Sequence, residues 1–120
     1  MLEHQKSLIE SKALVLKALA HTTRLFIVEE LARGEKCVCE FVDAVKVDFS
    51  TISKHLLVLK NAGIVADEKR GQQVFYRLKM KCLPDFIACI GNEIAAAAHA
   101  KAQMLTEHIV KPVVKTNAEA

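Results

Sequence analysis

The chain has few of the residues that punctuate a sequence or build a large aromatic core. It contains no tryptophan, and its aromatic residues are five phenylalanines and one tyrosine, so we expect a core of aliphatic side chains, mostly on helices. Only four glycines and two prolines interrupt it, which indicates one domain over residues 1–120, with flexible ends at 1–6 and 113–120. No run approaches the ~18 apolar residues of a membrane span, and no export signal is recognisable. We therefore expect a cytoplasmic protein without a membrane partner.

Cysteine is also sparse, and residues 1–36 contain none. In a chain without an export signal, the four cysteines are most simply reduced thiols, so a disulfide framework is not expected. Cys82 and Cys89 would lie about 10 Å apart along one helix, too far for a bridge within the chain. We interpret both as small core or interface residues and leave open that one of them serves as a metal ligand.

The net positive charge is small but concentrated in one segment. The net charge is +3, whereas residues 46–81 carry eight Lys or Arg against three Asp or Glu, which leaves −2 for the rest. Such a patch is what a phosphate backbone attracts. The sequence shows no Cys-x-x-Cys, no βαβ pattern and no nucleophile–base pairing, so an enzyme is disfavoured. A DNA-binding protein without a ligand stays open as a further class.

The spacing of hydrophobic residues is helical up to about residue 63, changes to the alternation of strands, and becomes helical again in the last segment. Helices are expected over residues 7–20, 22–31, 38–45, from about 50 to Gly63, and 83–110. We expect Thr22, and Asp48 or Ser50, as N-caps, Gly34 and Gly63 as C-terminal signals, and Pro112 as the end of the last helix. Residues 64–67 and 74–78 read as two strands joined across 69–73, with Gly71 in the turn.

Two helices joined by a short turn and followed by a hairpin with a basic tip predict a winged helix-turn-helix over residues 38–79. The fold class is therefore mainly α with a β-hairpin wing. In the second of these helices Ile52, Leu56 and Leu59 face inward, which directs small polar and basic side chains outward. The residues expected to contact DNA are Ser50, Thr51, Ser53, Lys54, His55, Lys69, Arg70, Gln72 and Gln73.

Four stretches, in this order, resemble the ArsR/SmtB family of small metal- and metalloid-responsive repressors. They are residues 19–25 (LAHTTRL), 36–41 (KCVCEF), 50–59 (STISKHLLVL), and 62–65 (AGIV) with 71–76 (GQQVFY). The resemblance covers roughly residues 10–95. It implies a homodimer formed by the terminal helices (7–20 and 83–110) on an inverted-repeat operator, with repression relieved when an inducer binds thiolates.

Cys37 and Cys39 are the predicted inducer site. Trivalent arsenic or antimony is soft and takes thiolates, and a helix N-terminus favours the thiolate form. On one helix, residues at i and i+2 lie about 200° apart, so we expect a shared ligand to unwind the start of the helix at 38–45. Cys89 or Cys82 is a candidate third ligand, and no cofactor is required.

The sequence departs from the family in ways that leave the inducer open. The third cysteine of many arsenic repressors falls at Val42, and the N-terminal cysteines of cadmium and lead sensors are absent, with His4 a weak substitute. The zinc site on the last helix is not completed by Asp85, His99 and His108. The alternatives are a cadmium-, lead- or zinc-type divalent metal sensor, or a thiol redox-sensing repressor of the same fold.

The last predicted helix also carries an apolar stripe. Ile87, Ile90, Ile94 and Ala98 recur at helical spacing among many alanines, and a monomer would leave this stripe in water. This pattern independently predicts a homodimer.

Overall fold

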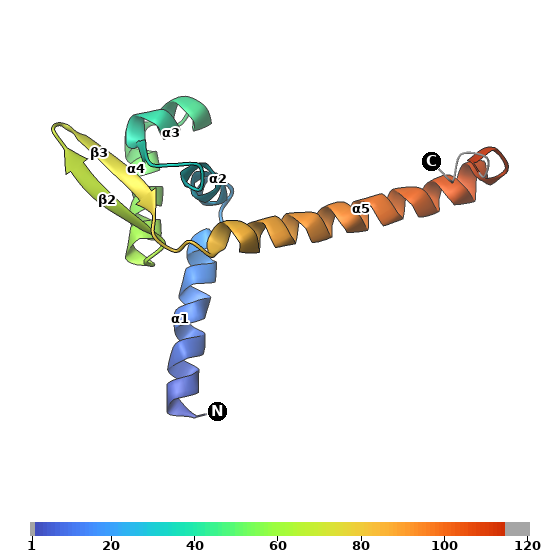
Figure 1. Cartoon of the computed structure of the whole chain (residues 1–120), viewed down its shortest axis with the longest axis horizontal. Coiled ribbons are helices and arrows are strands. Elements are labelled where there is room, and N and C mark those ends of the chain that lie inside the picture. The colour runs from blue at the N-terminus through green and yellow to red at the C-terminus, as the bar shows by residue number, and fades with distance from the viewer. Residues whose placement is uncertain (1, 115–120) are drawn as a thin grey trace. The chain divides into compact units, whose positions relative to one another are not determined.

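The computed structural model describes residues 2–114, with side chains described up to residue 106. The elements follow in the order helix, helix, strand, helix, helix, strand, strand and a long final helix (Figure 1). The predicted winged helix-turn-helix fold is confirmed. The chain divides into two compact units, one up to Pro84 and one from Asp85 onward, where the sequence predicts a single domain. Residues 115–120, most of the predicted flexible tail, lie outside the described residues.

The first two helices are α1 (Glu3–Leu19) and α2 (Thr22–Leu31). α1 begins before its predicted start at residue 7, so most of the segment 1–6 expected to be flexible is helical. The N-cap residue of α2 is His21 and not Thr22, because the extended backbone of His21 lets its Nδ1 accept the Thr23 N–H at 3.1 Å. α2 ends at Leu31, before the glycine at 34 that was expected to terminate it.

The helix-turn-helix consists of α3 (Val38–Val45) and α4 (Phe49–Asn61). Lys46 follows α3 with a φ of 63°, in the left-handed region that ends a helix. Asp48, in an extended conformation, is the N-cap residue of α4, one of the two caps that the sequence suggested.

The end of α4 is a Schellman motif built on Gly63. Gly63 has a φ of 80°, and its N–H donates to the Lys60 carbonyl at 2.9 Å. The next N–H, from Ile64, donates to the Leu59 carbonyl at 3.0 Å. These two bonds satisfy carbonyls that the helix end would leave free, so the glycine acts as the predicted end signal.

The sheet has three antiparallel strands in the order β1-β3-β2. The predicted hairpin comprises β2 (Val65–Arg70) and β3 (Gln73–Leu78), and because both strands are longer than predicted, its turn is reduced to residues 71–72. β1 (Lys36–Cys37) was not predicted, since two residues carry no periodicity. It pairs Cys37 with Phe75 and so brings the chain into α3 directly from the sheet.

The last helix, α5, spans Leu83–Val114 and runs past Pro112, where the sequence predicted its end. Most of its predicted apolar stripe is exposed on the single chain: Ile90 is 46% and Ile94 65% exposed, Ala98 is exposed as well, and Ile87 is half-buried. None of the described helices is long and apolar enough to cross a membrane.

The most deeply buried side chains of the first unit are aliphatic except for Phe41. The side chains that are at most 2% exposed come from α2, α3, α4, β2 and the junction between α4 and β2. They are Ile27, Val28, Phe41, Ile52, Leu56, Leu59, Ile64 and Val65. The inward stripe predicted for α4 is therefore confirmed, and it fixes which of its side chains face outward.

Two adjacent leucines of α4 allow a matched test of this core. Leu56 is fully buried and Leu57 is 53% exposed. We expect Leu56→Ala to lower the free energy of unfolding by about 2–5 kcal/mol, since it leaves a cavity, and Leu57→Ala to lower it by less than about 1 kcal/mol. Urea unfolding at one protein concentration measures both, and equal losses would contradict this orientation of α4.

Candidate DNA interface and thiol site

The first turn of α4 is organised by the side chain of Asp48. Its carboxylate accepts the Ser50 hydroxyl at 2.8 Å and the Thr51 hydroxyl. The hydrogen bond from Thr51, and then the one from Ser50, lower the pKa of this carboxyl. Because both hydroxyl protons point to Asp48, the two oxygens turn their lone pairs away from it. The first turn therefore presents hydroxyl acceptors in fixed positions, beside the exposed ammonium of Lys54.

His55 is not free on the outward face as predicted. Its Nδ1 lies 3.1 Å from Arg24 Nη1, and its ring centroid lies 4.4 Å from that of His21. A guanidinium only donates, so Nδ1 must be the acceptor and the ring must be neutral. Burial, followed by electrostatic repulsion from His21 and Arg24, lowers the pKa of His55. His55 thus links α4 to α2, and its expected contact with DNA is revised.

Arg24 is the residue of this cluster that the sequence analysis missed. Its Nε donates to the Ala18 carbonyl at 2.6 Å near the end of α1, while Nη1 reaches His55 on α4. One guanidinium therefore joins three helices. Its partner His55 is 31 positions away in the sequence, a separation that no local pattern reveals.

Arg70 on the wing also differs from its predicted role. Its guanidinium makes two hydrogen bonds to Glu35, at 2.5 and 3.0 Å, and two to Glu68, at 2.8 and 3.3 Å. It also lies over the ring of Phe75, 4.8 Å from the centroid. Arg70 is therefore occupied by two carboxylates instead of being available to a phosphate. The predicted contacts Lys69, Gln72 and Gln73 are exposed on the same hairpin.

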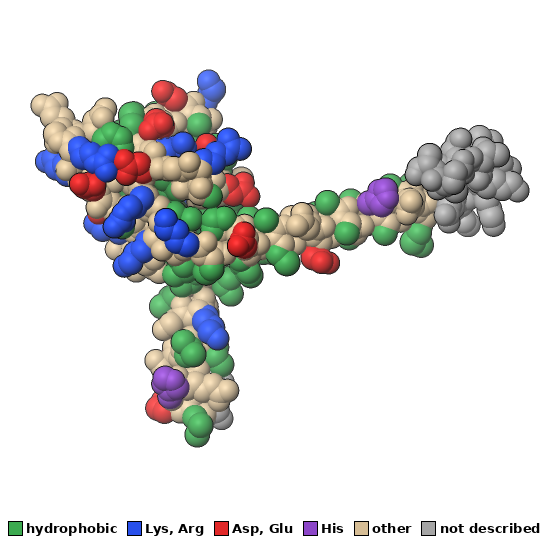
Figure 2. Space-filling view, viewed as in Figure 1, with side chains coloured by type: hydrophobic (Ala, Val, Ile, Leu, Met, Phe, Trp, Pro, Cys, Tyr) green, Lys and Arg blue, Asp and Glu red, His purple; other side chains and the backbone are tan. Residues whose placement is uncertain are grey.

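The basic patch is less positive than the sequence suggested. Figure 2 shows Lys and Arg side chains over the hairpin and the neighbouring helices, with Asp and Glu side chains interspersed. Lys60 forms an ion pair with Asp67 at 3.0 Å, and Arg70 pairs with Glu35, which lies outside the segment 46–81. The remaining exposed cations, such as Lys54 and Lys69, are the candidates for phosphate contacts.

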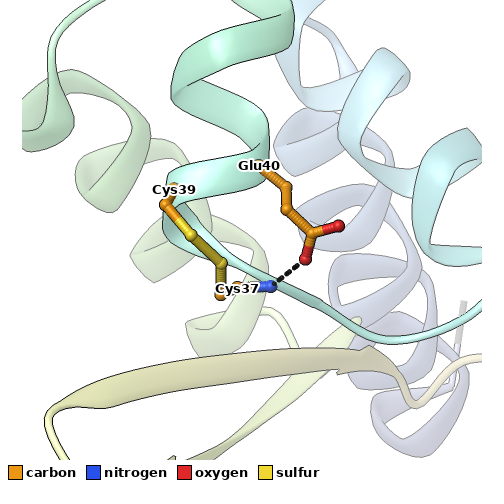
Figure 3. The surroundings of a disulfide bond; sticks show 3 residues. All are labelled: Cys37, Cys39 and Glu40. Atoms are coloured by element: carbon orange, nitrogen blue, oxygen red, sulfur yellow. Dashed lines mark hydrogen bonds between the residues drawn. A yellow bond between two sulfur atoms is a disulfide. The ribbon is translucent and has the colours of Figure 1, made fainter.

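The thiol pair lies where β1 meets α3 (Figure 3). Cys37 and Cys39 form a disulfide, with their Cα atoms 5.4 Å apart. Two expectations are thereby corrected: that these thiols are reduced, and that the two sulfurs can come together only if the start of the helix at 38–45 unwinds. Cys37 is the N-cap residue, with an extended backbone at φ −85° and ψ 165°, so only Cys39 lies in the helix. The sulfurs can approach each other without unwinding α3.

The surroundings of the pair determine which ions could fit. Cys37 is buried and Cys39 is exposed. The Cys37 N–H donates to Glu40 Oε2 at 2.9 Å, so Glu40 caps the helix. No group of three potential His, Cys, Asp or Glu ligands occurs within the described part of one chain. Cys82 and Cys89 are exposed free thiols, and a third ligand from either one stays a prediction.

Comparison with known proteins gives the family. A family profile described as "Bacterial regulatory protein, arsR family" matches residues 21–67. The arsenical resistance operon repressor of Escherichia coli K12 is 35% identical over 98 residues, which cover 81% of this chain and 83% of the relative. This chain belongs to the ArsR family. The resemblance stated from the sequence motifs is thereby confirmed.

Other relatives of this ArsR-family chain agree over shorter lengths. The HTH-type transcriptional repressor SmtB of Mycobacterium tuberculosis H37Rv is 40% identical over 73 residues, 61% of this chain; the chain spans about half, 54%, of that relative's length. Among solved structures, the homodimeric winged helix-turn-helix DNA-binding domain Mb0332 of Mycobacterium bovis matches with a TM-score of 0.70 and 28% identity. The match covers 85% of this chain and 93% of that one.

The His55 contact predicts a dependence of stability on pH. Since the pKa of His55 is lowered in the folded chain, the unfolded chain, with a His pKa of about 6.5, takes up the proton first. The stability that neutral His55 contributes should therefore be fully present above that pH and be lost as the pH falls below it. A His55→Gln variant keeps an acceptor for Arg24 and cannot titrate, so its melting temperature should fall less between pH 7.5 and 5.5. Equal acid sensitivity of the two proteins would assign the effect to another group.

Proposed function

We propose that this ArsR-family protein is a homodimeric DNA-binding repressor that leaves its operator when trivalent arsenic or antimony binds Cys37 and Cys39. The observation that carries the proposal is the position of the thiol pair. Its two sulfurs lie together at the start of α3, the first helix of the helix-turn-helix. A ligand there acts where β1 joins α3, the helix that supports α4.

DNA binding is supported by the geometry of α4 and the wing. The buried stripe of α4 leaves Ser50, Thr51 and Lys54 accessible at its first turn, the part of a recognition helix that enters the major groove. Hydroxyl oxygens accept from base edges, and Lys54 supplies a phosphate contact. Ser53, Lys69, Gln72 and Gln73 extend this surface along α4 and to the wing.

A homodimer is supported by the apolar side chains that one chain leaves exposed. They lie on α1, where Leu14 is 63% exposed, and on α5, where Ile94 is 65% exposed. A groove of about 510 Å³ beside α1 is lined by Leu14, Val15 and Val58. A second copy would remove this surface from water, and the α4 helices of the two protomers could then each bind one half of an inverted repeat.

The ligand chemistry favours arsenic or antimony over zinc. Reduction of the disulfide by a dithiol, with two electrons and two protons, gives two thiols. Arsenite then exchanges two hydroxyls for two sulfurs, each thiol proton leaving in a water molecule, with no change in oxidation state. Zinc in a closed protein site takes four ligands, and the described residues of one chain bring no three together.

The disulfide itself favours a second candidate function. If oxidation of Cys37 and Cys39 alone changes operator affinity, the pair is a redox sensor, and arsenite mimics the cross-link. The same chain would then answer oxidants and arsenite through one site.

Lys54 tests the DNA contact, with Lys60 on the same helix as its control. Lys54 is exposed, whereas Lys60 is paired with Asp67. We expect Lys54→Ala to weaken binding to a duplex selected by the protein from random DNA, and to reduce the slope of log K against log salt by about 1. Lys60→Ala should leave the slope unchanged. Identical slopes for wild type and Lys54→Ala would misplace the interface.

The inducer site is tested by replacing each thiol singly. Cys37→Ser and Cys39→Ser should keep operator affinity and lose release by arsenite, because one sulfur cannot bridge. Cys82→Ser and Cys89→Ser serve as controls and should still be released, unless one supplies the third ligand. Fluorescence anisotropy under reducing conditions measures release. A Cys37→Ser/Cys39→Ser variant that still leaves its operator on arsenite addition would sink the arsenic mechanism, and release by oxidation alone would establish the redox alternative.

A further inference from the structure

Arg70 joins the wing to the segment that carries the thiol pair. It is the last residue of β2, next to the wing turn at Gly71. Its partner Glu35 lies directly before β1, two positions before Cys37. Cys37 in turn pairs with Phe75 of β3, the residue whose ring Arg70 covers. The contacts therefore form a closed circuit from the thiol pair through the sheet to the wing tip and back.

The guanidinium is committed to this circuit. Of its five N–H donors, four are used in the bonds to Glu35 and Glu68. The three charged groups together sum to −1, which disfavours a DNA phosphate at this point. Bidentate pairing also fixes the orientation of the guanidinium plane, which a single contact would leave free.

We propose that Arg70 is a positioning residue whose ion pair with Glu35 couples the state of the Cys37–Cys39 pair to the position of the wing. The proposal rests on the proposed function. A ligand bound by the Cys37 sulfur displaces β1. Glu35 moves with β1 because it directly precedes this strand in the chain. Arg70 follows through its two bonds to Glu35 and shifts the hairpin turn that bears Lys69, Gln72 and Gln73.

This route replaces the one suggested by the sequence, in which ligand binding unwinds α3. Since Cys37 is already outside the helix, the sulfurs can share a ligand while α3 stays intact. The backbone of Cys37 is instead shared with the sheet, so the strain of ligand binding reaches β3 and the wing. The pair is exposed, with side chains 43% and 40% accessible, and exposed pairs contribute little to folding stability. Its loss should therefore appear in the coupling and not in the melting temperature.

The coupling is measured as the ratio of operator dissociation constants with and without arsenite, by anisotropy under reducing conditions. Glu35→Gln and Arg70→Gln should each reduce this ratio by about fivefold, with little change in operator affinity without inducer. The double variant should lose no more than either single variant, because both remove one link. Glu68→Gln is the matched control: it removes the other carboxylate but keeps the link to Glu35, and its ratio should equal that of wild type.

A second measurement separates this inference from the proposed function. Amide NMR signals of residues 69–73 are followed in the oxidised, reduced and arsenite-treated protein. In wild type these signals should shift with the state of the thiols. In Glu35→Gln and Arg70→Gln only signals of residues 35–42, next to the thiol pair, should shift, and those of residues 69–73 should not. Wing signals that do not move in wild type, or that move equally in Glu35→Gln, would overturn the coupling.

Two further outcomes are decisive. If the wing responds in wild type but arsenite leaves the operator complex intact, the proposed function fails and the coupling stands. If Arg70→Gln weakens operator binding and reduces the salt slope by about 1 while Glu35→Gln does neither, Arg70 is a phosphate contact and the coupling fails.

Discussion

Cys37 belongs to two elements at once, and the rest of the site depends on this overlap. It is the last residue of β1 and the N-cap residue of α3. Its N–H donates to the Glu40 carboxylate, and its sulfur is bonded to that of Cys39, with the two Cα atoms 5.4 Å apart. Because the same residue pairs with Phe75, the thiol, the start of α3 and the register of the sheet cannot move independently. This overlap is why the proposed coupling from a ligand at the thiol pair to the wing runs through the short strand β1.

The orientation of α4 is set by two kinds of interaction. Burial of Ile52, Leu56 and Leu59 holds α4 against the core, but burial is non-directional and tolerates small rotations. The hydrogen bond between Arg24 and His55 is directional, and Arg24 is itself fixed to α1 through the Ala18 carbonyl. The rotation of α4 is therefore tied to the end of α1, a helix that the proposed dimer would bury.

Periodicity was sufficient to predict the helices, the hairpin and the buried face of α4, because each follows from several residues of regular spacing. It could not predict β1, which has two residues, or the partners of His55 and Arg70, which lie 31 and 35 positions away. The error at Cys37 has a different origin. Assigning both cysteines to one helix assumed helical dihedrals at the first, whereas a capping residue is extended. Whether the two sulfurs can approach each other therefore depends on the residue at which α3 begins, and periodicity does not give that boundary.

Charge counted along the sequence overestimates what DNA would meet. Arg70 is neutralised by carboxylates from two segments, and Lys60 by Asp67 across the junction of α4 and β2. Each paired cation would have to break its ion pair before it released a counterion from DNA, so it adds little to the salt dependence of binding. On the proposed interface, affinity would then depend on the exposed unpaired cations, and discrimination between bases on the hydroxyls that Asp48 orients. A weakly charged interface of this kind needs the wing in place, so in the proposed mechanism a modest displacement of the hairpin would be enough to release the operator.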